Sequence, residues 1–125
     1  MNNTTPIIDI IELKLVINEA INSYLLKLES TLLQPHELFL NNFLELFKLN
    51  TTELFSAKKT ISIREHRQVL QYILMTNFHL QYSKVGEITN RDRTTILHSC
   101  TTVKNLLDIS DGNISRIYNK ALSLI

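Results

Sequence analysis

The sequence has few of the residues that interrupt helices or build catalytic loops: two glycines, two prolines and one cysteine in 125 residues. Because Cys100 is the one thiol, the chain can form no internal disulfide, and such cysteine usage is typical of a reducing cytoplasm. Two glycines cannot build the loop that cradles nucleotide phosphates, and no Gly-x-x-x-x-Gly-Lys-Ser/Thr motif is present. We therefore expect no nucleotide cofactor and no ATP-driven activity.

Signals for secretion, membrane insertion and catalysis are also missing. No basic segment precedes an apolar run at the N-terminus. The most apolar stretch, residues 7–33, is interrupted by charged residues that include Asp9, Glu12, Lys14, Glu19 and Lys27. The four histidines show no metal-ligand spacing, and no triad signature is recognisable. The sequence predicts a cytoplasmic protein that is not an enzyme, holds no metal or other cofactor and contacts no membrane.

The net charge of +1 conceals an uneven distribution of charge along the chain. Residues 1–50 hold three basic and six acidic residues, a net charge of −3, whereas residues 58–104 hold eight basic and three acidic residues, a net charge of +5. A basic region of this kind can neutralise the phosphates of a nucleic acid. Nucleic acid is therefore a candidate partner for the second half of the chain.

Apolar residues recur every three or four positions over residues 7–33, which predicts one long amphipathic helix. Its stripe consists of Ile10, Leu13, Ile17, Ile21, Leu25, Leu28 and Leu32. Pro35 is expected to end this helix, because the residue before a proline avoids the α-helical region. We therefore divide the chain into an N-terminal helix, residues 1–35, and a domain of residues 36–125.

The domain is expected to be all-α, because no window alternates with a period of two. About six helices are expected in all. They are residues 36–49, a short turn within 51–56, and residues 62–77, 82–88, 92–107 and 114–124. The short turn is expected to be capped by Thr51 or Thr52. Ser62 is the expected N-cap of the helix at 62–77, with Glu65 as its capping-box partner. The expected buried faces include Val69, Leu70, Ile73 and Leu74 on one helix, and Ile96, Leu97, Cys100, Val103 and Leu107 on another.

The helices at 82–88 and 92–107 are separated by about three residues, the spacing of a helix-turn-helix. Gly86 is expected to let another backbone approach, and Asp92 to cap the second helix. The outer face of that helix would carry Arg93, Thr94, Thr95, His98, Thr101, Thr102 and Asn105. Hydroxyl groups donate to phosphate oxygens, and a helix N-terminus attracts anions, so this face is suited to DNA.

The stretch RDRTTILHSC, residues 91–100, resembles the recognition-helix signature of the C-terminal DNA-binding domain of the bacterial replication initiator DnaA family. The segments ELFSAKK, SIREHRQVLQYIL and YSKVGEI resemble, in order, that family's leucine-rich turn with its basic loop, its helix with an Arg-Gln pair, and its first helix-turn-helix helix. The resemblance covers roughly residues 36–125. It implies a Trp-repressor-like helix-turn-helix fold, to which the N-terminal helix is an addition.

The resemblance also implies roles for individual residues. Lys59 would reach into the minor groove, Arg67 and Gln68 would contact a base edge and a phosphate, and Asp92 to Thr95 would enter the major groove. The full set expected to contact DNA is Lys58, Lys59, Arg67, Gln68, Lys84, Arg91, Asp92, Arg93, Thr94, Thr95 and His98.

Three positions depart from the family pattern. Arg93 stands where the family has histidine, Lys59 stands where it has arginine, and the turn EITNRD is about one residue shorter and lacks a glycine pair. A different preferred DNA sequence is therefore expected, since arginine can fork onto guanine O6 and N7.

Two functions are open at this stage. The first is sequence-specific binding of double-stranded DNA, in the control of replication initiation or of transcription. The alternative is a protein-interaction adaptor, or an inhibitor of a replication protein, that has lost DNA binding. The N-terminal helix could fold back on the domain, pair two copies of the chain or dock on another protein.

Overall fold

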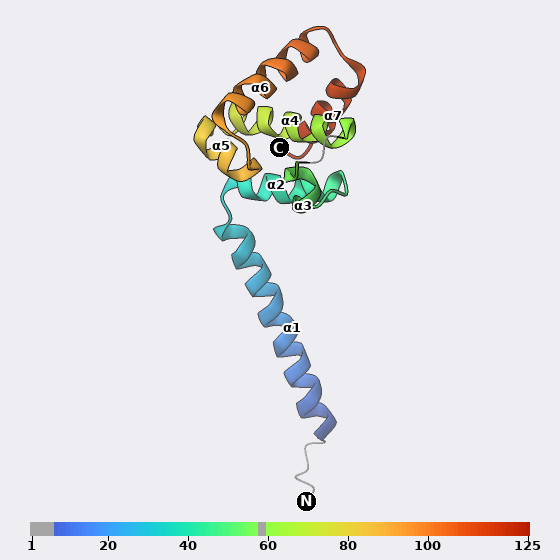
Figure 1. The fold of residues 1–125 in the computed structure, drawn as a ribbon. Coiled ribbons are helices and arrows are strands. Elements are labelled where there is room, and N and C mark those ends of the chain that lie inside the picture. Colours follow the sequence, from blue (N-terminus) through green and yellow to red (C-terminus); the bar gives the residue numbers. More distant parts are fainter. Residues whose placement is uncertain (1–6, 58–59) are drawn as a thin grey trace, which may run out of the picture. The chain divides into compact units, whose positions relative to one another are not determined.

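The computed structural model describes residues 7–57 and 60–125, and within them the chain forms seven helices and no strand (Figure 1). The helices are α1 (Ile7–Leu32), α2 (Pro35–Leu46), α3 (Thr51–Phe55), α4 (Ile61–Thr76), α5 (Tyr82–Thr89), α6 (Arg93–Asp108) and α7 (Gly112–Leu122). The predicted all-α class is confirmed. The chain divides into two compact units, Met1–Gln34 and Pro35–Ile125.

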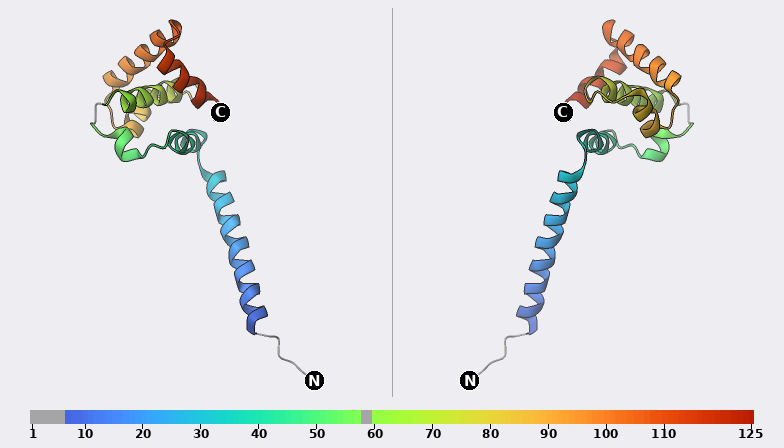
Figure 2. Two further views of the ribbon diagram at one scale, coloured as in Figure 1. Left: turned by 90° about the vertical axis from the view of Figure 1, so that its right-hand side faces the viewer. Right: turned by 90° about the vertical axis from the view of Figure 1, so that its left-hand side faces the viewer.

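The first unit contains one unbroken helix, α1 (Figure 2). All its described side chains, residues 10–28 and 32, are exposed, with the large apolar ones between 37% and 78% accessible. The helix ends close to the predicted position. Pro35 begins α2 itself, because a proline suits the first turn of a helix. The predicted start of the second helix at His36 was therefore one residue late.

The core of the second unit is built around α4, which contacts α2, α3, α5, α6 and α7. Val69, Leu70, Ile73 and Leu74 are fully buried on it, as predicted. Buried side chains from the other helices complete the core: Phe39, Phe43, Leu54, Val85, Ile96, Val103, Ile114, Ile117 and Ala121. This cluster gives α5 and α6 a rigid support.

Leu97 was wrongly predicted to face the core, since it is 39% exposed. The buried face of α6 runs through Ile96, Ser99 and Val103, with Cys100 and Leu107 partly buried beside it. Position 97 lies about 100° around the helix from position 96, so it points away from α4. Cys100, predicted to be a small core residue, is partly buried beside the core. Burial raises the pKa of its thiol to about 11, which does not favour a reactive role.

Two predicted caps were also wrong. The N-cap of α3 is Asn50, whose Oδ1 accepts the Glu53 N–H at 2.7 Å, rather than Thr51 or Thr52. Helix α4 begins at Ile61 after an extended Thr60, so Ser62 lies inside the first turn and forms no capping box with Glu65. In both segments several adjacent residues can accept a hydrogen bond, so the local sequence does not decide which of them is the cap.

The last helix, α7, begins at Gly112, two residues before the predicted start, and Asp111 caps it by accepting the Ile114 N–H at 3.0 Å. We predict that Asp111→Ala lowers the stability of the domain by about 1 kcal/mol, because the first turn of α7 loses a half-buried acceptor. Thermal denaturation followed by circular dichroism measures this. Asn119→Ala, an exposed change on the same helix, is the control. An unchanged melting temperature in Asp111→Ala would show that the cap contributes nothing.

Candidate nucleic-acid interface

Helices α5 and α6 form a helix-turn-helix whose turn is the predicted three residues, Asn90 to Asp92. Asn90 ends α5 in the left-handed conformation (φ 54°). Glycine is the usual residue at such a helix end, and asparagine tolerates the conformation better than most other residues. The backbone N–H of Arg91 then donates to the Gly86 carbonyl at 2.9 Å. A Cβ placed on Gly86 would lie 2.5 Å from the Arg91 carbonyl oxygen. This close approach explains the glycine that the sequence places on α5.

The leading end of α6 is exposed, and Asp92, Arg93, Thr94 and Thr95 are all accessible. Asp92 is the N-cap, as predicted, and its Oδ1 accepts the Thr95 N–H at 2.7 Å. Hydrogen bonds from the side chain and then the backbone of Thr95 lower the Asp92 pKa. The carboxylate is therefore ionised at neutral pH, and its contribution as a cap is lost only as the pH falls through this lowered pKa.

Arg93, the first residue of α6, is held beside α5. Its guanidinium carbon lies 5.6 Å from the centre of the Tyr82 ring, within the range of a cation–π contact. The residue is otherwise exposed. An arginine held in this way is suited to bidentate donation to an acceptor pair such as guanine O6 and N7.

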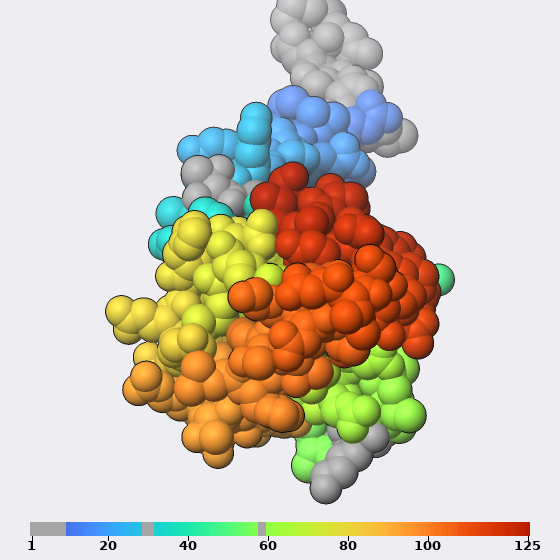
Figure 3. Space-filling model, turned by 90° about the horizontal axis from the view of Figure 1, so that it is seen from above, coloured from blue at the N-terminus to red at the C-terminus, as the bar shows by residue number. Residues whose placement is uncertain are grey.

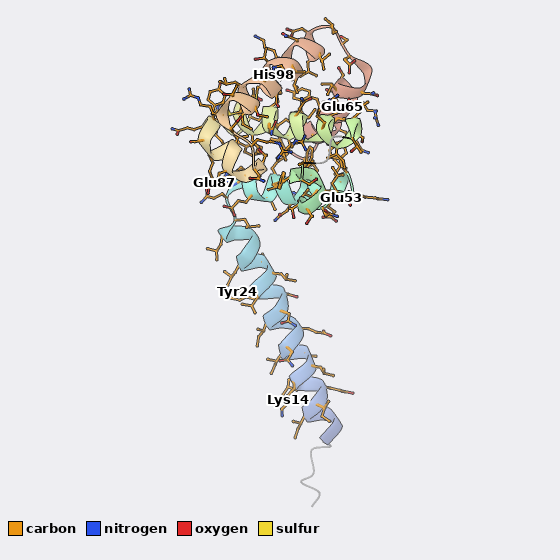
Figure 4. All side chains as sticks on the ribbon, viewed as in Figure 1. Lys14, Tyr24, Glu53, Glu65, Glu87 and His98 are labelled. Atoms are coloured by element: carbon orange, nitrogen blue, oxygen red, sulfur yellow. The ribbon has the colours of Figure 1, made fainter. Side chains whose placement is uncertain are left out.

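His98 lies on α6 one turn after Thr94 and Thr95 and is exposed (Figure 4). It lines a groove between α4, α6 and α7 together with Gln68 and Thr102. Figure 3 shows α6 (orange) and α7 (red) side by side on one face of the domain. The structure thus brings Gln68 and His98 together, although they are thirty residues apart in the sequence.

Three arginines from two segments surround Ala57 in a second pocket: Arg64, Arg67 and Arg91. Arg67 is only 8% exposed, and its Nη1 donates to the Leu54 carbonyl at 3.0 Å. Burial lowers the Arg67 pKa, and the charges of Arg91 and Arg64 lower it further. The three positive charges lie close together and repel one another. An anion such as a phosphate would reduce that repulsion, so the pocket favours anion binding.

The structure distributes the predicted residues over several surfaces. Asp92, Arg93, Thr94 and Thr95 lie together at the tip of α6, Gln68 and His98 share a groove, and Lys84 is exposed on α5. Arg67 and Arg91 lie side by side, with their guanidinium groups directed to backbone carbonyls. Lys58 and Lys59 lie outside the described residues.

Two residues of this surface were missed from the sequence. Arg64 could have been found, because it precedes Arg67 by three positions and so shares its side of α4. Tyr82 carried no comparable signal, because its contact with Arg93 depends on how the turn folds.

Neither a metal site nor a membrane-spanning helix is found in the part of the chain that the structure describes. No group of three or more His, Cys, Asp or Glu side chains there could hold a metal ion. None of the helices described combines the length and the apolar character of a membrane span.

Comparison with known proteins places residues 40–103, about half of the chain, in the family described as the bacterial dnaA protein helix-turn-helix. Curated relatives carry the name chromosomal replication initiator protein DnaA. The protein of Bacteroides fragilis is 31% identical over 74 residues, 58% of this chain and 16% of the relative. That of Chromobacterium violaceum is 29% identical over 82 residues, 65% of this chain and 17% of the relative. No solved structure gave a significant match.

The chain therefore spans about a sixth of the length of the curated relatives it matches. The matched region includes α3 to α5, the turn and most of α6, which are the elements that carry the predicted DNA-contacting residues. The resemblance seen in the sequence is thus confirmed: the chain belongs to the bacterial DnaA helix-turn-helix family.

Proposed function

We propose that this protein binds double-stranded DNA in a sequence-specific manner, with the N-terminal end of α6 in the major groove. The observation that carries the proposal is the exposed leading end of α6, where Asp92, Arg93, Thr94 and Thr95 are all accessible on a helix supported by a buried core. Helix-turn-helix proteins read base edges with this part of the second helix. Arg93 has the hydrogen-bonding groups to read a guanine.

Phosphate contacts would supply most of the affinity. Lys84 on α5, Arg64 beside the arginine pocket, and Gln68 and His98 in the groove are accessible for such contacts. Minor-groove contact by Lys59, with Lys58 beside it, remains a prediction from the family resemblance. Direct contacts by Arg67 and Arg91 also remain predictions, and their backbone hydrogen bonds favour a supporting role for both.

The relatives' name, chromosomal replication initiator, favours a role in replication initiation, with transcription regulation as the alternative setting. Either role places the protein with chromosomal DNA in the cytoplasm. We propose no catalytic role, because DNA binding is the activity that the helix-turn-helix supports.

A binding selection tests the proposal. The purified chain is incubated with a pool of random-site duplexes at two salt concentrations, and the bound fraction is sequenced and titrated by fluorescence anisotropy. We expect one enriched motif and an affinity that falls steeply between the two salt concentrations, because several phosphates are neutralised. Salt-sensitive binding without an enriched motif would support DNA binding but contradict its sequence specificity. No binding at low salt would overturn the proposal.

A second function, protein interaction through α1, is favoured by the exposed apolar stripe of that helix. We propose that its partner is a second copy of the chain. Two such stripes packed together would bury on the order of 1,000 Å², enough for a specific interface. Pairing would also present two helix-turn-helix domains to two half-sites, as two-fold DNA readers do. An adaptor that binds a replication protein through α1 is the alternative.

Analytical ultracentrifugation of the full chain distinguishes these partners. Ile17→Asp changes the apolar stripe, and Leu26→Asp, on the opposite side of α1, is the matched control. We expect a dimer for the wild type and for Leu26→Asp, and a monomer for Ile17→Asp. A wild-type chain that stays monomeric at micromolar concentration contradicts the second-copy proposal and favours a different protein partner.

A further inference from the structure

The C-terminal end of α3 is capped by two arginines from elsewhere in the domain. Arg67 of α4 donates to the Leu54 carbonyl at 3.0 Å. Arg91 of the helix-turn-helix turn donates to the Phe55 carbonyl at 3.2 Å through Nη1 and to the Ser56 carbonyl at 2.6 Å through Nη2. A five-residue helix cannot pair its last carbonyls internally. Guanidinium groups therefore supply the donors for three consecutive carbonyls.

The backbone of Arg91 is also fixed, since its N–H donates to the Gly86 carbonyl at 2.9 Å. The guanidinium Nη1 donates in addition to the Asn90 carbonyl at 2.8 Å. The next residue, Asp92, is the N-cap of α6. One residue thus joins the end of α5, the start of α6 and the end of α3, which lies 35 residues earlier in the sequence.

We propose that Arg91 is a positioning residue that fixes the leading end of α6 against the C-terminal end of α3. This inference rests on the proposed function, in which the leading end of α6 binds DNA. Arg91 acts through the backbone of Phe55 and Ser56 rather than by reading a base. Its effect on DNA binding is to hold the turn between α5 and α6, and with it the start of α6, in one place on the domain.

The chemistry of the side chain supports this role. Arginine has a rigid, planar set of donors that reaches two carbonyls at once, whereas the single ammonium of lysine cannot reproduce that geometry. The contact also forms although the positive charge of Arg67 lies close by, as the lowered Arg67 pKa indicates. The hydrogen bonds from Arg91 to the two carbonyl oxygens therefore outweigh the electrostatic repulsion between the guanidinium groups of Arg67 and Arg91.

Two substitutions, Arg91→Lys and Arg91→Ala, test the inference, with Arg93→Ala as the control that removes an equal charge two residues away. The first measurement is hydrogen exchange of the free protein. In both Arg91 variants we expect the backbone amides of Leu54 and Phe55 to exchange about tenfold faster or more, since α3 opens more often once its last carbonyls lose their charge-assisted hydrogen bonds. Amides of α4, including those of Leu70 and Ile73, serve as the reference for global stability. Arg93→Ala should leave the exchange of Leu54 and Phe55 unchanged.

The second measurement is affinity for a selected duplex. Arg91→Lys keeps the charge, so a residue that only contacts a phosphate should lose no more than about threefold in affinity, whereas a positioning residue should lose about tenfold. Unchanged exchange of Leu54 and Phe55 in both variants, or full affinity in Arg91→Lys, would overturn the inference. If the wild type binds no DNA, the proposed function fails. The exchange measurement still shows whether Arg91 holds the end of α3.

Discussion

Replacing Gly86 by alanine is expected to destabilise the domain by about 1–3 kcal/mol, because the new methyl group would overlap a fixed backbone atom. The Cβ would lie 2.5 Å from the Arg91 carbonyl oxygen, which cannot move without displacing the turn between α5 and α6. The same turn carries Arg91 and the α6 cap. We therefore expect a lower melting temperature together with weaker DNA binding, measured by thermal denaturation and fluorescence anisotropy.

Gly112→Ala is the matched control for this change. A Cβ on Gly112 meets no atom within 4 Å, and the residue lies in the first turn of α7. Alanine there should leave stability unchanged or raise it by up to about 1 kcal/mol, since alanine favours helices. Equal melting temperatures for Gly86→Ala and the wild type would show that the close approach of Gly86 to Arg91 is not a constraint on the fold.

Arg93→Ala is expected to lower the affinity for a selected DNA site by about 1–3 kcal/mol and to relax the preference at one base pair. The physical reason is the loss of two parallel hydrogen bonds from the guanidinium, for which guanine offers the matching acceptor pair, O6 and N7. Competition titrations against duplexes changed at single positions measure both effects. The stability of the domain should change little, because Arg93 is exposed and its contact with Tyr82 is a weak one.

Lys84→Ala provides the comparison, because it removes an exposed positive charge from α5 without removing a base reader. It should weaken binding to all duplexes by a similar factor and reduce the salt dependence by about one phosphate contact. If Arg93→Ala also weakened all duplexes alike, Arg93 would be a phosphate contact, and base reading would have to lie elsewhere on α6.

Much of the fold follows from the sequence, because the helices depend on local patterns. The buried face of α4 was predicted from the spacing of Val69, Leu70, Ile73 and Leu74, and the start of α6 from Asp92. The errors fell where local signals compete. Thr51, Thr52 and Asn50 can all cap a helix, and Leu97 is as apolar as Ile96, so tertiary packing decides between them.

The candidate site could be predicted only in part, for a similar reason. The tip of α6 is a continuous stretch of sequence, so Asp92 to Thr95 could be proposed as a unit. The roles of Arg67 and Arg91 depend on carbonyls of α3 that are 13 to 36 residues away. Nothing in the sequence distinguishes an arginine that supports the backbone from one that faces DNA. The partner of α1 is open for the same reason, because an apolar stripe does not specify what covers it.

The proposed contact between Arg93 and a base edge can be tested directly once a binding motif has been selected. Each guanine of the motif is replaced in turn by 7-deazaguanine, which lacks the N7 acceptor, and both the wild type and Arg93→Ala are titrated. We predict one guanine at which the substitution lowers wild-type affinity about tenfold but changes the affinity of Arg93→Ala less than about twofold, since coupled partners are not additive. Additive losses at every guanine would contradict the central claim, that Arg93 at the leading end of α6 reads a guanine in the major groove.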